Sequence, residues 1–407
     1  MFIGLIKNEF IKLFSKAKTY IIIALFILLC LFVLFISHTN EKMYSSEFMI
    51  ETVENQIKWQ KEYIKDTENN EDLSEEEKEQ DIRYSKEYLE ELEVELKNLK
   101  FEARSEENDW RKNYKDQIAS LKEEIASFPA KKEATKDDAD MIAEIEQNIE
   151  ELELKLAADT SPGDEHKNSG INYLHFVISL VSGGFLAFGL ILFNGDSVSN
   201  EYNPGTFKFL LIQPVTRAKV LLSKYFVMAS TSTVLIVGVQ AIFFAIIGLV
   251  KGFGNFERPM LVGLEYEEVV FHGQLMMQKI AGSGYYIPLW NYVLRVLFLE
   301  ILFIITLTAF AFMISTIAKS SVISNTIAIC TLLGTSIAYG ISATYNSISH
   351  FIFLHFASVD EIATGSIVGS TGSAYFTFPM VVIVSIVSTI VFIAISLGVF
   401  KKRDLLI

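Results

Sequence analysis

The chain has 407 residues, of which 51% are hydrophobic, and its net charge is −14. The charge is segregated, because residues 38–170 hold 38 acidic and 19 basic side chains whereas the rest of the chain holds 11 and 16. An acidic, polar segment therefore interrupts a basic and very apolar chain, which indicates two different environments. We expect a lipid bilayer as one of them and no nucleic acid as a partner.

Residues 1–18 are predicted to form an amphipathic helix that lies on the inner face of the membrane. Its apolar residues share one stripe, with the lysines largely elsewhere: Phe2, Leu5, Ile6, Phe10, Leu13 and Phe14. The alternative is that this segment is only the start of the first span. Residues 1–37 are thus predicted to hold an interfacial helix and span 1.

Six apolar runs are long enough to cross a bilayer, which takes about 20 helical residues. They are 20–36, 173–193, 226–250, 289–314, 321–345 and 378–400. The first run is too long for a signal peptide and has no small-residue cleavage site after it, so we interpret it as a retained anchor. Lysine and arginine gather on the side that holds both termini, which the positive-inside rule places in the cytoplasm. The expected location is a cell membrane, with residues 38–170 outside.

The acidic segment 38–170 is predicted to be a separate helical domain outside the cell. Four apolar seams with helical spacing run through it, and they begin at Ile50, Leu89, Ile118 and Ile142. Thr135 is a candidate N-cap for the last helix. We expect antiparallel helices that pack as a coiled-coil-like hairpin or small bundle. The segment has no cysteine and hence no disulfide, which is more typical of a bacterial surface than of an animal secretory route.

Residues 171–407 are predicted to hold spans 2–6 and two outer loops. The loop 251–288 contains several glycines and is expected to be irregular. The loop 346–377 is too apolar for an ordinary loop and too interrupted for a span, so we expect short helices that re-enter the outer membrane surface. The predicted fold class is an all-α membrane protein with six transmembrane helices.

The sequence has no catalytic or metal-binding motif. A Gly-Lys pair is absent, which excludes a P-loop and therefore ATP hydrolysis by this chain alone. We expect no bound cofactor or metal. Arg295 and Glu300 are the unusual polar residues, because both fall within the predicted fourth span. The functional interpretation is that they line a translocation path or fix a helix interface. The alternative is that Glu300 only forms a structural pair with a hydroxyl group or with Arg295.

The stretch 199–226, "SNEYNPGTFKFLLIQPVTRAKVLLSKYF", joins the second and third spans on the cytoplasmic side. Asn-Pro-Gly forms a turn, since proline fixes φ and glycine accepts positive φ. Thr206 then caps a short amphipathic helix that ends at Pro214. A short helix held between two turns can move as a rigid body, and we place it at about 203–217.

This stretch resembles the first cytoplasmic loop of type-2 ATP-binding-cassette (ABC) exporter permeases. The positions that carry the resemblance match the family's acidic residue, Gly-Thr pair, leucine-rich stretch and Pro-Val-Thr-Arg motif. They are Glu201, Gly205, Thr206, Leu210, Leu211, Pro214, Val215, Thr216, Arg217 and Lys224. Phe207 lies on the apolar face of the same short helix.

The resemblance implies that the short helix is a coupling helix that docks on a separate ATP-binding subunit, which binds ATP and Mg²⁺. It also implies a second permease chain, either identical or related. Relatives export antimicrobial peptides, lantibiotics, drugs, sodium or polysaccharides, and we favour the peptide or drug class. The long outer domain departs from the compact members of the family.

The alternative is a membrane subunit that transmits force from an ATPase without moving a cargo. Its outer domain would then regulate a cell-wall enzyme or bind an accessory protein. Such chains usually have four spans, so six spans and the loop motif favour export.

Overall fold

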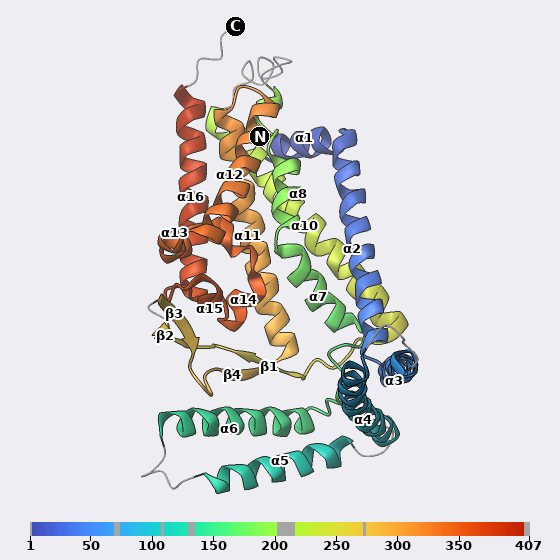
Figure 1. Cartoon of the computed structure of the whole chain (residues 1–407). Helices are drawn as coiled ribbons and strands as arrows, with labels where there is room; N and C mark the ends of the chain where they lie inside the picture. The colour runs from blue at the N-terminus through green and yellow to red at the C-terminus, as the bar shows by residue number, and fades with distance from the viewer. Residues whose placement is uncertain are drawn as a thin grey trace.

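The computed structural model describes residues 2–68, 74–106, 110–128, 135–201, 216–271 and 274–402. Helices dominate this part of the chain, as predicted, and Figure 1 shows the long apolar ones standing side by side above a set of helices that lie across them. Among the described residues, five helices are long and apolar enough to cross a membrane. They are α2 (Ala17–Met43), α10 (Arg217–Lys251), α11 (Leu289–Ile317), α12 (Ser321–Ile341) and α16 (Phe378–Lys402).

A bent pair of helices stands where one continuous second span was predicted. Helix α7 (Gly170–Ser182) and the segment of α8 (Phe185–Asn194) and η1 (Ser199–Glu201) meet at an angle of 66°. The span predicted at 173–193 therefore corresponds to two helix segments that meet at an angle rather than to one straight helix. The break falls at Gly183-Gly184, where Gly184 has φ +155°, a conformation that residues with a side chain rarely adopt. Counting the pair as one span gives six spans in total.

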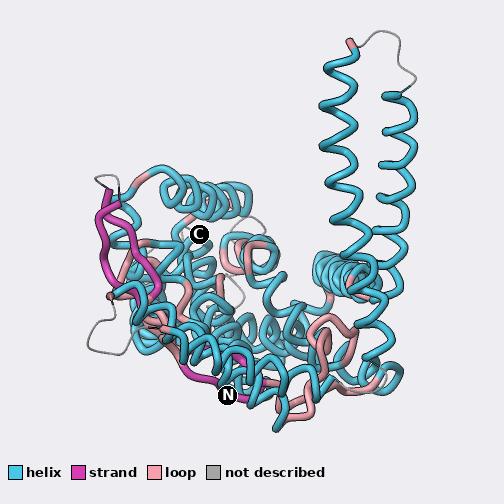
Figure 2. Tube along the Cα trace, turned by 60° about the horizontal axis from the view of Figure 1, so that its bottom comes forward, coloured by secondary structure: helices cyan, strands magenta, loops and turns pink. Residues whose placement is uncertain are grey.

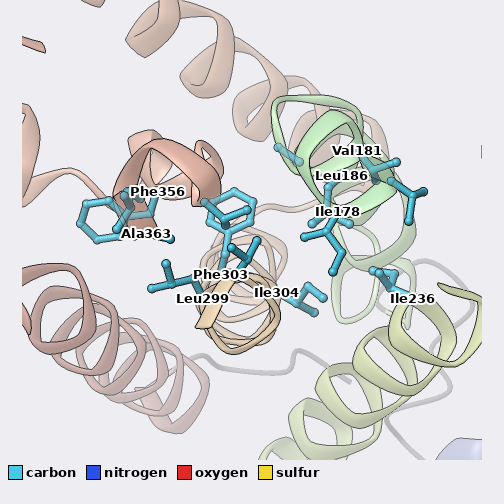
Figure 3. Close-up of a cluster of buried hydrophobic side chains, with 14 of the residues drawn as sticks. Ile178, Val181, Leu186, Ile236, Leu299, Phe303, Ile304, Phe356 and Ala363 are labelled. Atoms are coloured by element: carbon cyan, nitrogen blue, oxygen red, sulfur yellow. The ribbon is translucent and has the colours of Figure 1, made fainter. Parts of the chain in front are cut away.

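Helix α11 forms the centre of the apolar core. In its most apolar window 67% of the residues are buried, against 17–22% in the other four long helices. Figure 3 shows Leu299, Phe303 and Ile304 of α11 between two groups of apolar side chains. One group includes Phe356, and the other includes Ile178 of α7. This packing places four of the other candidate spans around α11, since α7, α8, α10, α12 and α16 all contact it, whereas α2 packs on α7, α8 and α10.

Helix α1 (Phe2–Phe14) is separate from the first span and lies across its end (Figure 1). The turn at Ser15 and Lys16 divides α1 from α2, so α1 is not merely the start of the span. Its buried residues are Leu5, Glu9 and Leu13, which are four apart and share one face. That face packs mainly on α10.

The acidic segment forms two antiparallel helix pairs. The first pair is α3 (Ser46–Glu68) with α4 (Glu75–Glu106), and the second is α5 (Trp110–Ser127) with α6 (Lys136–Ala157). Each pair has its own apolar cluster, around Leu92 in the first and Ile149 in the second. Thr135 caps α6 as predicted, in a capping box with Asp138. Figure 2 shows the α3/α4 pair projecting away from the rest of the chain.

Truncating Leu92 is expected to loosen the α3/α4 pair alone. Leu92 is 2% exposed and contacts the α3 side of the cluster that includes Val53 and Ile57. Leu92→Ala should destabilise the pair by about 2–5 kcal/mol, because it leaves a cavity in the cluster. Hydrogen exchange should become faster in α3 and α4 and stay unchanged in α5 and α6. Equal acceleration in all four helices would show that they form one cooperative unit.

The expectation of an irregular loop at 251–288 is wrong. This segment holds β1 (Pro259–Val262) and β2 (Tyr266–Phe271), followed by β3 (Gln274–Lys279) and β4 (Tyr285–Pro288). The strands pair antiparallel, β1 with β4 and β2 with β3. Helix α6 lies against this unit, because the Gln147 side chain donates to the Ser283 carbonyl at 2.8 Å.

Short helices occupy residues 346–377, as predicted. They are α13 (Ala343–Ile348), η2 (Ser349–Phe351), η3 (Phe353–Ala357), α14 (Val359–Thr364) and α15 (Ile367–Thr371). Phe353 and Phe356 of η3 are buried, and η3 and α14 both contact α11. Their depth in a membrane stays a prediction.

Candidate functional site

The structure describes both ends of the predicted coupling segment. Its central residues, Gly205, Thr206, Phe207, Leu210, Leu211 and Pro214, lie outside the described residues. Glu201 ends η1 immediately before this stretch, and Arg217 begins α10 just after it. The candidate site therefore consists of the residues that contact the two described ends of this segment.

A buried cluster of charges joins these two ends to α1. The ammonium group of Lys224, on α10, donates to Glu9 of α1 at 2.5 Å and to Glu201 at 2.6 Å. The Lys12 ammonium lies 3.5 Å from both carboxylates. The cluster of Glu9, Lys12, Glu201 and Lys224, hereafter the Lys224 cluster, holds two positive and two negative charges.

Because Lys224 and Glu9 are buried, each of these charges depends strongly on its partners in the Lys224 cluster. Lys224 is 4% exposed and Glu9 is 6% exposed, so neither charge can be solvated by bulk water if its partner is removed. Breaking one partner of a buried ion pair generally costs about 3–5 kcal/mol, because it leaves an uncompensated charge. The three segments that supply the cluster are therefore held in one arrangement.

The segment before Glu201 is anchored to the core through hydroxyl groups. The Ser315 hydroxyl, on α11, accepts hydrogen bonds from the backbone N–H groups of Val198 and Ser199, each at 3.0 Å. The Ser324 hydroxyl, on α12, donates to the Gly195 carbonyl. Lys18, at the start of α2, pairs with Asp196 at 2.6 Å. The entry to the coupling segment is thus tied to three of the candidate spans.

The other end of the segment contacts the last helix. The Arg217 guanidinium lies 3.5 Å from the carbonyl oxygen of Lys401, near the end of α16. Val220 and Leu221 of α10 pack with Phe312 and Phe400 in a small buried cluster. The start of α10 therefore packs against α1, α11 and α16.

Sequence reasoning did not select Glu9. It is the one acidic residue among residues 1–18, and it lies between Leu5 and Leu13 on the apolar face of α1. A single carboxylate at an apolar position is the signal that was available, because such a group needs a partner when that face is buried.

The two polar residues of the fourth span lie apart from the Lys224 cluster, and the structure does not pair them with each other. Glu300 is fully buried and accepts a hydrogen bond from the Gln240 side chain of α10 at 2.8 Å. Arg295 contacts Asn291 at 3.2 Å and the Tyr285 hydroxyl at 3.3 Å. The expected pairing of Glu300 with a hydroxyl or with Arg295 is wrong, because an amide on α10 lies closer to the carboxylate.

The fold and this site define a multi-pass α-helical membrane protein. Ion pairs of the Lys224 cluster connect the residues on either side of the segment between its second and third spans. A family model described as "ABC-2 family transporter protein" matches residues 3–405. The chain belongs to this family and is the membrane component of an ABC transporter rather than its ATPase. It is also similar to the uncharacterized protein YhcI of Bacillus subtilis, with 26% identity over 315 residues that cover 75% of this chain and 87% of YhcI. Membership implies association with an ABC ATP-binding subunit.

Proposed function

We propose that this chain is the permease of an ABC exporter and that residues 203–217 form the helix that couples it to its ATPase. The observation that carries this proposal is the Lys224 cluster, which links both ends of the segment to α1. A force applied to the segment reaches the spans through buried ion pairs and packed side chains, which resist deformation. Two permease chains, each with an ATP-binding subunit on the cytoplasmic side, would form the working transporter.

Introducing a carboxylate on the apolar face of the predicted coupling helix, or in the turn before it, should uncouple the complex. Leu211→Asp or Gly205→Asp is expected to lower substrate-stimulated ATP hydrolysis by about tenfold or more, since an apolar docking groove does not accommodate an unpaired carboxylate. The measurement uses the purified complex in proteoliposomes. Val94→Asp is the matched control, because Val94 is an apolar residue that is 58% exposed on α4. Unchanged coupling in both loop variants would argue against the proposal.

The substrate class that we favour is a peptide, lantibiotic or drug. The support is the composition of the α3/α4 pair, in which Trp59, Tyr63, Tyr84 and Tyr88 are 47–75% exposed. Residues 46–106 hold 20 acidic and 9 basic side chains. Aromatic and acidic groups together suit a cationic, partly apolar ligand.

The exposed aromatic and acidic side chains of the α3/α4 pair also favour the alternative role. In that role the projecting pair regulates a cell-wall enzyme or an accessory protein. Replacing residues 46–106 by a short Gly/Ser linker separates the two functions. Labelled nisin, a cationic lantibiotic, serves as the probe in inside-out vesicles. ATP-dependent uptake that requires residues 46–106 supports peptide export. Stimulated ATP hydrolysis without uptake by the full-length complex supports the regulatory role.

A further inference from the structure

A polar pocket of about 530 Å³ opens where the acidic segment meets the transmembrane helices. Helix α6 and strands β1 and β4, which contribute to its lining, lie at the end of the molecule away from α1 (Figure 1). The end of α2, the end of α6, the start of α7 and strands β1 and β4 all contribute to its lining. None of these groups belongs to the Lys224 cluster, so the pocket is independent of the proposed coupling.

The lining includes a buried guanidinium that the rest of the chain satisfies poorly. Arg258 is 6% exposed, and its Nε has no hydrogen-bond partner within the described residues. Its ion pair with Glu165 spans 3.8 Å, which is too long for a hydrogen bond. Burial lowers the pKa of Arg258, while the nearby Glu165 opposes that change. A buried charged donor of this kind requires an anion close to it.

Each cation of the pocket faces one carboxylate, and only the carboxylate of Arg258 lies beyond hydrogen-bond distance. Lys155, Lys167 and Arg258 supply three positive charges, and Glu151, Asp164 and Glu165 supply three negative charges. Lys155 pairs with Glu151 at 2.6 Å, and Lys167 pairs with Asp164 outside the lining at 2.5 Å. Glu165 is 46% exposed at its side chain and is free to turn toward water when another anion approaches Arg258. His166 and His175 also line the pocket.

The pocket also lies at the ends of two candidate membrane-spanning segments, α2 and α7. Ser37 and Asn40 occupy the last turns of α2, whereas Asn172 and His175 occupy the first turns of α7. These are the ends of candidate spans, so the pocket borders the hydrocarbon region rather than lying within it. A guanidinium fork binds phosphate through two parallel hydrogen bonds.

We propose that the Arg258 pocket binds a phosphate group, supplied either by a lipid headgroup or by a soluble phosphate ester. The guanidinium holds the phosphate oxygens through its planar fork of N–H donors. A bound phosphate would join the acidic segment to the membrane end of α2 and α7, because the pocket is lined by all three.

The test uses the full-length chain purified in detergent, with calorimetric titration of dihexanoyl phosphatidic acid. The same chain is titrated with glycerol 3-phosphate and with dihexanoyl glycerol, which has no phosphate. Arg258→Gln is expected to weaken binding of phosphatidic acid about tenfold or more, since a charge-assisted hydrogen bond is lost. Arg258→Lys keeps the charge but loses the fork, so it should weaken binding less. Arg83→Gln, an equal change at an exposed site on α4, should have no effect.

Each result has a defined meaning. Equal binding of glycerol 3-phosphate and phosphatidic acid supports the site with a soluble ligand, and binding of phosphatidic acid alone supports it with a lipid. The proposal is overturned if dihexanoyl glycerol binds as tightly as phosphatidic acid, or if the wild-type chain binds neither phosphate probe. It is also overturned if Arg258→Lys and Arg258→Gln both match Arg83→Gln. Should Arg258→Gln fail to fold, Arg258→Lys carries the comparison.

Discussion

Replacing Lys224 with methionine is expected to destabilise the chain by about 3–5 kcal/mol, because the buried Glu9 and the partly buried Glu201 then lose their ion pairs of 2.5 Å and 2.6 Å. Thermal unfolding in detergent should occur at a lower temperature, and hydrogen exchange in α1 should become faster. Substrate-stimulated ATP hydrolysis should fall in the assembled complex even at temperatures where the variant is folded. The reason is that α1 and α10 are no longer held to the start of the coupling segment.

Two control variants distinguish the effect of losing the Lys224 charge from the effect of replacing a lysine side chain with methionine. Lys219→Met makes the same substitution at an exposed position of α10 and should change stability little. Combining Lys224→Met with Glu9→Gln and Glu201→Gln removes the unpaired charges and should restore much of the stability. If the triple variant is no more stable than Lys224→Met, the ion pairs are not what stabilises this region.

The second large effect is expected at Gln240. Gln240→Leu removes the donor to the fully buried Glu300 and should destabilise the packing of α10 on α11 by about 3 kcal/mol. Glu300→Gln keeps the shape of the side chain and a polar partner for Gln240, so it should change the unfolding temperature only slightly. The double variant Gln240→Leu with Glu300→Leu should recover stability, because both polar partners are then gone.

These variants also decide between the two roles of Glu300. Burial and the bond to Gln240 favour a helix interface, and we propose that role. Transport measured in proteoliposomes should then follow stability across the series. A Glu300→Gln variant that is as stable as the wild type and yet does not transport would instead place Glu300 on a translocation path.

The sequence predicts well the parts of the fold in which the burial of apolar side chains decides the structure. Runs of apolar residues long enough to span a bilayer correspond to α2, α10, α11, α12 and α16. The seams of the acidic segment correspond to the clusters around Leu92 and Ile149, because helical spacing places each seam on one face.

The parts that could not be predicted depend on contacts between distant residues. Strand β1 pairs with β4, whose residues lie more than twenty positions away, so the short apolar stretch at 259–262 carries little local signal. The bend at Gly184 depends on a backbone conformation inside an apolar run that reads as continuous helix. The Lys224 cluster joins Glu9 to a residue 215 positions away, and Arg258 was passed over because its burial follows only from the assembled pocket.

The most direct test of the central claim is photo-crosslinking from position 211 in the assembled complex. A photoreactive amino acid is placed at Leu211, and a second variant carries it at Lys122 of α5 as the control for the acidic segment. The expected product is a covalent adduct between position 211 and the ATP-binding subunit, with no such adduct from position 122. If position 122 reacts with the ATP-binding subunit and position 211 does not, the segment at 203–217 is not the element that couples this permease to its ATPase.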